Sequence, residues 1–106
     1  MSKIQYAVIT YDGMGSLIQS FYCNVFSDYE KAKAYLNWIW EDWCNDMIAD
    51  GYELIFEDTY HEDEYAKLSL EDGSYAEFTL IKISEPSEKF IKEYENRGGK
   101  HTTLPA

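Results

Sequence analysis

The hydrophobic pattern of this chain is most regular in its middle, at residues 27–51. Apolar side chains recur there every three or four residues, which is the spacing of one face of an α-helix. Ser27 and Glu30 have the spacing of a capping box, and Asp50-Gly51 is a typical helix stop. The pattern predicts one long helix, whose core face carries Tyr29, Ala32, Leu36, Ile39, Trp40, Trp43 and Met47.

Short runs of β-branched and aromatic residues surround this helix and predict the strands of a sheet. They lie at residues 3–11, 17–26, 52–58, 65–70 and 75–83, and residues 59–64 are expected to form a loop. Period-two alternation in the last two strands points one set of side chains inward. This set is Ala66, Leu68, Leu70, Ala76, Phe78 and Leu80.

The predicted order β-β-α-β-β-β-α is that of a small α+β protein. Residues 1–97 are expected to form a single acidic domain, in which the long helix packs on one face of an antiparallel sheet of about five strands. The first strand is expected inside the sheet, because both of its faces are fairly apolar. Residues 85–96 predict a second, short helix, and residues 98–106 are expected to be a flexible tail.

Charge changes this picture more than any motif does. The chain has 20 Asp and Glu against 9 Lys and Arg, which gives a net charge of −11. The excess lies in the middle of the chain, where residues 28–50 carry −4 and residues 51–72 carry −7. Such a field repels nucleic acid and anionic membranes and attracts basic partners. The alternative is that the acid only keeps a small protein in solution.

The cysteines and the N-terminal residues indicate a compartment. Cys23 and Cys44 are too few for a disulfide framework, and the first residues lack the pattern of a secretion signal. No run approaches the roughly 18 apolar residues of a membrane span. A cytoplasmic location with both thiols reduced is therefore expected.

Patterns for catalysis and metal binding are sparse. Residues 58–64, DTYHEDE, hold four carboxylates and one histidine but lack the spacing of a calcium loop. His61 has no histidine or cysteine nearby in sequence to complete a zinc site. Cys44 lies beside acid, which raises the pKa of a thiol and makes it a poorer nucleophile. No enzymatic activity, cofactor or metal is predicted.

Charge and aromatic content together predict a small acidic protein-binding domain. It would act as a DNA mimic that occupies the basic nucleic-acid-binding channel of a protein such as a nuclease, and it would bind no nucleic acid itself. In size and composition the chain resembles the small acidic inhibitors of phages and mobile elements, anti-CRISPR and antirestriction proteins among them. This likeness is one of physical type, without a shared motif. The predicted partner-binding residues are Trp38, Glu41, Asp42, Asp46, Glu57, Asp58, Tyr60, Glu62, Asp63, Glu64 and Tyr65.

Trp38 also supports an alternative function. It falls on the charged face of the long helix, where it either anchors a contact or is covered by a loop or a second helix. In the alternative, the chain is a non-catalytic, self-associating accessory or structural module. A homodimer would then bury Trp38 and a tyrosine-rich sheet face, and the acid would serve solubility.

Overall fold

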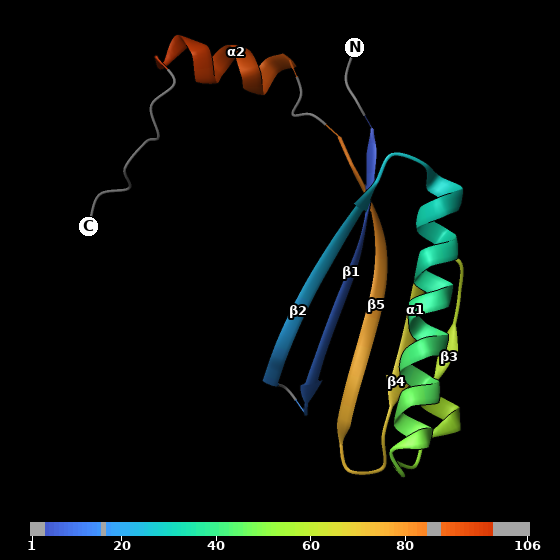
Figure 1. The fold of residues 1–106 in the computed structure, drawn as a ribbon. Helices are drawn as coiled ribbons and strands as arrows, with labels where there is room; N and C mark the ends of the chain where they lie inside the picture. Colours follow the sequence, from blue (N-terminus) through green and yellow to red (C-terminus); the bar gives the residue numbers. More distant parts are fainter. Residues whose placement is uncertain (1–3, 16, 85–87, 99–106) are drawn as a thin grey trace, which may run out of the picture.

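A long helix packed on a five-stranded sheet makes up most of the computed structural model, which describes residues 4–15, 17–84 and 88–98 (Figure 1). The predicted α+β class and element order are confirmed. Residues 85–87, at the start of the second predicted helix, and residues 99–106 of the predicted tail lie outside the described residues. The elements are β1 (Gln5–Met14), β2 (Leu17–Phe26), α1 (Tyr29–Ala49), the 3-10 turn η1 (Phe56–Asp58), β3 (Tyr60–His61), β4 (Tyr65–Ser69), β5 (Ser74–Ile83) and α2 (Glu88–Asn96).

Every pair of neighbouring strands is antiparallel, in the order β2-β1-β5-β4-β3. β1 lies inside the sheet, as its two apolar faces predicted, and β2 and β3 are the edges. α1 covers one face, and no other described segment covers the opposite face, which we call the open face (Figure 1). α2 stands apart from the sheet, beyond the end of β5 (Figure 1).

The core lies between α1 and the sheet. The six side chains predicted to point inward from β4 and β5 are each no more than 6% exposed. From α1, Ala32 and Leu36 are fully buried against them. Trp43 meets Phe78 edge-on, with ring centroids 5.4 Å apart. The indole N–H of Trp40 donates to the backbone oxygen of Lys67 at 2.9 Å, which ties the helix to β4.

The C-terminus of α1 ends at the predicted stop. Gly51 has a φ of +91°, which is the left-handed conformation that glycine adopts without a Cβ clash. Its N–H donates to Ile48 O, and the Tyr52 N–H donates to Met47 O, each at 3.0 Å. This pair of bonds is a Schellman motif, which fixes the direction in which the chain leaves the helix.

The N-terminal cap differs from the prediction. The capping residue is Asp28 and not Ser27, since an Asp28 carboxylate oxygen accepts the Lys31 N–H at 3.2 Å. Asp28 has the extended backbone that a cap requires, and aspartate caps a helix as well as serine does. The helix therefore begins one residue later than the capping-box pattern indicated.

The strand predicted at residues 52–58 is wrong. Only Leu54 forms a β-bridge there, and the chain then turns through η1. The third strand is β3, inside the segment predicted as a loop. Ser69 of β4 explains the break, because its hydroxyl donates to Asp58 at 2.5 Å and its N–H donates to the Thr59 hydroxyl at 3.1 Å. Side chains, more than a regular backbone ladder, hold this segment against β4.

Buried core side chains and the exposed face of α1 are expected to differ sharply in their contribution to stability. Leu36→Ala or Phe78→Ala should lower the free energy of unfolding by about 2–5 kcal/mol, because each removes a buried side chain from a packed core. Trp38→Ala should cost less than about 1 kcal/mol, because Trp38 is 59% exposed. Urea unfolding followed by circular dichroism measures both. Equal losses from Trp38→Ala and Leu36→Ala would contradict this assignment of the helix faces.

Candidate functional site: an acidic end with a pocket

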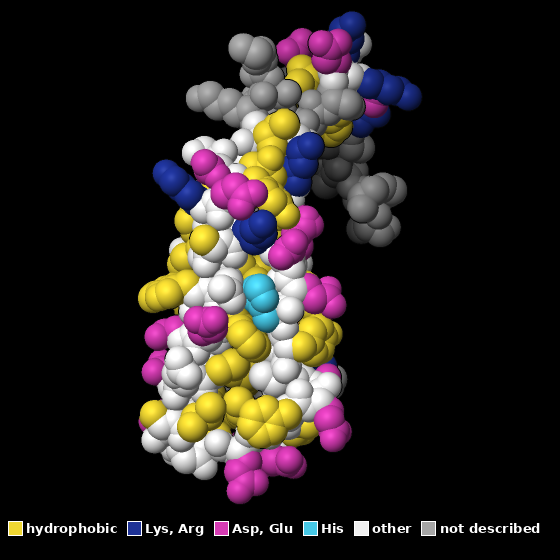
Figure 2. Space-filling view, turned by 90° about the vertical axis from the view of Figure 1, so that its right-hand side faces the viewer, with side chains coloured by type: hydrophobic (Ala, Val, Ile, Leu, Met, Phe, Trp, Pro, Cys, Tyr) yellow, Lys and Arg dark blue, Asp and Glu magenta, His cyan; other side chains and the backbone are white. Residues whose placement is uncertain are grey.

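The structure places the predicted partner-binding residues on three parts of the surface. One group is on the outer face of α1, one on the open face of the sheet, and one in η1 and the loop between β3 and β4. Seen from the side of α1 and β3, acidic side chains are dispersed among apolar ones (Figure 2). The group on α1 is Trp38, Glu41, Asp42 and Asp46. The group on the open face is Asp58, Tyr60 and Tyr65, and the group in η1 and the β3–β4 loop is Glu57, Glu62, Asp63 and Glu64.

The group on the open face makes contacts within the protein that join η1 and β3 to β4. Asp58 pairs with Lys67 at 3.0 Å and accepts the Ser69 hydroxyl hydrogen bond. The bond from Ser69, followed by the contact with Lys67, lowers the pKa of the Asp58 carboxyl. Burial, followed by the neighbouring Tyr60, raises the pKa of Tyr65 to about 12, and the two rings are 5.9 Å apart. The charge of Asp58 is thus compensated within the protein.

Trp38 is an exposed ring in an acidic strip. No described loop or helix covers it, and its ring lies beside that of Tyr35, with centroids 5.9 Å apart. Asp42 and Asp46 follow at steps of four residues, both exposed. The strip runs about 12 Å along α1 towards its C-terminus.

Another group of acidic residues belongs to the segments where α1 stops and the two long hairpins turn, and these segments lie at the lower end of Figure 1. Backbone bonds join these turns. The Gly15 N–H donates to Gly73 O at 3.2 Å, and the Glu71 N–H donates to Glu53 O at 2.9 Å. The sequence has no lysine or arginine from residue 34 to residue 66, so the segment between α1 and β4 brings no positive charge here. We call this surface the acidic end and define it as Asp12, Asp46, Asp50, Glu53, Glu71 and Asp72.

Part of the acidic end opposes the stability of α1. Asp46 and Asp50 lie at the helix C-terminus, where the macrodipole is negative, and the last turn has no basic residue. Each such carboxylate costs about 0.3–1 kcal/mol. Lys31 and Lys33 lie at the opposite end of the helix, where Lys33 pairs with Glu30 at 3.3 Å. These carboxylates weaken the helix and are nevertheless present, which indicates that they have a role outside folding.

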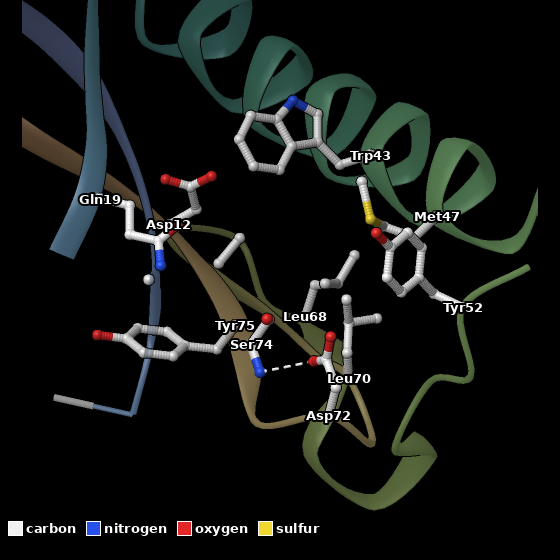
Figure 3. A pocket seen from close by; sticks show the side chains of 12 residues that line it. Asp12, Gln19, Trp43, Met47, Tyr52, Leu68, Leu70, Asp72, Ser74 and Tyr75 are labelled. Carbon is white, nitrogen blue, oxygen red and sulfur yellow. Dashed lines mark hydrogen bonds between the residues drawn. The ribbon is translucent and has the colours of Figure 1, made fainter. Parts of the chain in front are cut away.

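A pocket of about 170 Å³ opens at the acidic end, between the last turns of α1 and the sheet (Figure 3). Trp43 and Met47 line it from α1, with Tyr52 beside Met47 (Figure 3). Asp12 reaches into the same space from β1. Its Oδ1 atom is buried and has no hydrogen-bond partner within the described ranges. The other lining residues are Gly13, Gln19, Leu68, Leu70, Asp72, Ser74, Tyr75 and Ala76.

The lining of this pocket suits a long side chain with a positive end. A cavity of about 150 Å³ accommodates a benzene-sized group, so the pocket has room for one side chain. The apolar walls can pack against an aliphatic stem, and Trp43 and Tyr52 are rings on which a cation can lie. Asp12 provides a buried acceptor, and Asp72 a second carboxylate in the lining. Lysine and arginine side chains combine an aliphatic stem with a positive end, and therefore fit this lining.

Much of this site was missed in the prediction from sequence, namely Asp12, Glu53, Glu71 and Asp72 of the acidic end and Tyr52 of the pocket. Asp12, Asp72 and Tyr52 come from different turns and carry no shared motif. A signal was nevertheless present, because Asp12 and Asp72 each directly precede a glycine in a hairpin segment. Only the strand order, with β1 beside β5, shows that these two segments lie at the same end of the sheet.

The described residues contain neither a metal-ligand group nor an activated thiol at Cys44. Within the described ranges, no three His, Cys, Asp or Glu side chains form a group that could hold a metal ion. Burial, followed by the nearby Glu41 carboxylate, raises the pKa of the Cys44 thiol to about 11. A nucleophilic cysteine needs the opposite shift. The absence of a cofactor and of enzymatic activity stays a prediction.

Comparison of the chain with protein-family models, with curated proteins and with solved structures finds no match. Among the described helices, none combines the length and the apolar character needed to cross a membrane. A functional proposal therefore depends on the arrangement of this chain's own side chains.

Reversing the charge of the two helix-terminal carboxylates is expected to stabilise the protein. Asp46→Lys with Asp50→Lys should raise the free energy of unfolding by about 0.5–2 kcal/mol, because lysine is favourable at the negative end of a helix dipole. Urea midpoints at low salt provide the measurement. The control, Glu62→Lys with Asp63→Lys, makes the same change in net charge away from the helix C-terminus. An equal gain in the control would assign the effect to general charge repulsion instead of the dipole.

Proposed function

We propose that this chain is a small acidic protein-binding domain whose acidic end occupies the basic nucleic-acid-binding channel of a partner protein. The observation that carries the proposal is the group of carboxylates around the C-terminus of α1. Asp46 and Asp50 oppose the helix dipole, and the chain from residue 34 to residue 66 offers them no lysine or arginine. In the complex, basic residues of the partner neutralise them.

Mimicry of nucleic acid follows from the density of this charge. DNA presents about one phosphate charge per 1.7 Å of its axis, and its binding channels hold it largely with lysine and arginine. Six carboxylates belong to the acidic end, and the strip through Asp42 extends the contact to the exposed ring of Trp38. The same field repels nucleic acid, so the partner is a protein.

Rigidity makes this mimicry efficient. The Schellman motif fixes the end of α1, and the bonds between turns fix the hairpins before any partner arrives. A surface ordered in advance loses little conformational entropy on binding. The proposed inhibitor is of the anti-CRISPR or antirestriction kind that the chain resembles in size and composition, and a nuclease is the type of partner that fits.

The pocket gives the proposed contact a specific anchor. One lysine or arginine side chain of the partner would enter between Trp43 and the sheet and bring its charge to the unpartnered oxygen of Asp12. Hydrogen bonds to a buried charge are among the stronger ones, at about 1.5–3 kcal/mol. The pocket therefore supplies affinity, whereas the surrounding carboxylates mainly speed association.

Charge reversal at the acidic end is expected to abolish competition with DNA. Proteins captured by the immobilised domain from a nuclease-treated lysate would be purified and tested with labelled duplex DNA by fluorescence anisotropy. The wild-type domain should displace the DNA, and the displacement should weaken steeply between about 50 and 200 mM salt. Asp46→Lys with Asp50→Lys should weaken it by about tenfold or more, a loss of about 1.4 kcal/mol.

The control for this experiment is the Glu62→Lys and Asp63→Lys variant, which changes the net charge equally. It should retain most of the affinity, because its carboxylates lie outside the acidic end. Since the acidic-end variant is expected to be the more stable one, unfolding cannot account for its loss of binding. Equal losses in the two variants, or no displacement of DNA by the wild type, would contradict the proposal.

The pocket is tested separately by Asp12→Asn, which keeps the shape of the side chain and removes its charge. Affinity for the captured partner should fall about 10- to 100-fold, which corresponds to one charged hydrogen bond. Trp38→Ala should have a smaller effect and act mainly on the dissociation rate. Unchanged affinity in Asp12→Asn would exclude the pocket from the contact and leave the carboxylates of the acidic end as the binding surface.

A further inference from the structure

β2 is a long edge strand with an apolar surface. It bonds to β1 along one side, and its other side pairs with no described strand. None of its ten residues is buried. Five large apolar side chains are at least half exposed, on both faces of the strand. They are Leu17 (70%), Ile18 (62%), Phe21 (62%), Tyr22 (51%) and Val25 (52%).

This edge lacks most of the features that usually keep a strand from pairing with another chain. Proteins protect exposed edges with charged side chains, proline, short strands or bulges. β2 has no charged residue and no proline, and its one irregularity is a register shift near its start, opposite Asp12 and Gly13. The opposite edge is protected, because β3 has two residues and Glu62, Asp63 and Glu64 follow it.

Charge argues for a second copy of this chain as the occupant of the edge. The sequence has no charged residue between Asp12 and Asp28, although the whole chain carries −11. A basic partner would find no counter-charge on β2. Two copies would meet where neither is charged. The acidic loop after β3 is four strand spacings away, about 19 Å, which exceeds twice the screening length of about 8 Å at physiological salt.

We propose that two copies of the protein pair through β2, antiparallel and around a two-fold axis, so that their sheets join into one sheet of ten strands. The five side chains expose roughly 100 Å² each, about 1,000 Å² over two copies, and edge pairing buries the part of this area that faces the other copy. The backbone bonds along two ten-residue edges add to this contact, which is expected at the small end of specific interfaces.

This arrangement replaces the dimer expected from the sequence, which used Trp38 and a tyrosine-rich sheet face. It also leaves the proposed function intact. Antiparallel pairing around an axis through the sheet points the two acidic ends in opposite directions, so each remains free for its own partner. The dimer does not depend on the proposed function, and either can be wrong without the other.

Sedimentation equilibrium across micromolar concentrations tests the pairing. The wild type should approach twice its monomer mass of 12.4 kDa. Phe21→Lys with Val25→Lys should raise the dissociation constant at least about tenfold while circular dichroism stays native, because both positions are exposed. The control is Ile81→Lys, which adds one charge to the open face two strands from the edge, at a position that is 40% exposed. It should leave the dimer intact.

Each other outcome contradicts edge pairing. A wild type that stays monomeric, or a dimer that persists in the Phe21→Lys and Val25→Lys variant, removes β2 as the interface. Equal disruption by Ile81→Lys indicates that the open faces stack on each other. A monomer that captures an unrelated extended peptide along β2 assigns the edge to another protein.

Cys23 provides a second readout within the same strand. It is exposed on β2, whereas Cys44 is buried, so a short bis-maleimide should react at Cys23 alone. An axis near the middle of β2 brings the Cys23 side chains of two copies within a few residues of each other. A covalent dimer should form in the wild type and be absent in Cys23→Ser and in the Phe21→Lys and Val25→Lys variant. Equal cross-linking in that last variant would show random collision and overturn the pairing.

Discussion

The packing of α1 against the sheet determines where everything else lies. Leu36 and Phe78 are fully buried in this layer, and Trp43 meets Phe78 edge-on. Because the helix is fixed there, its C-terminus comes to rest beside the turns of two hairpins. The acidic end is therefore a product of the tertiary fold, and it brings Asp12 of the first hairpin together with Asp50, which follows the helix. Loss of this packing would disperse the carboxylates and remove the pocket.

Charge and apolar surface are separated in this protein. The acidic end gathers carboxylates at one end of the two layers, while β2 presents an uncharged edge along one side of the sheet. Each arrangement lowers the stability or the solubility of an isolated domain: acid at a helix C-terminus weakens the helix, and an apolar edge invites association. Together they fit a protein that works in contact with others, with one surface for a basic partner and another for its own copy.

Periodicity was sufficient to predict most of the fold, because core positions repeat locally. The alternation that buries Ala66, Leu68 and Phe78 is visible in the sequence, and so is the stop at Gly51. Residues 52–58 were predicted wrongly because their apolar composition favours a strand, whereas side-chain bonds from Ser69 hold them in a turn. The site was only partly predictable, since its residues are distant in sequence and are joined by strand order.

We propose the acidic end as the contact surface for basic partners. The most direct test of this proposal is a nitrogen-15 NMR titration of the domain with a short peptide of alternating arginine and glycine. We expect the largest shifts on the amides of Asp12, Asp46, Asp50 and Asp72 and on the indole N–H of Trp43, which lines the pocket. Largest shifts at residues 62–64, with the Trp43 signal unmoved, would contradict it.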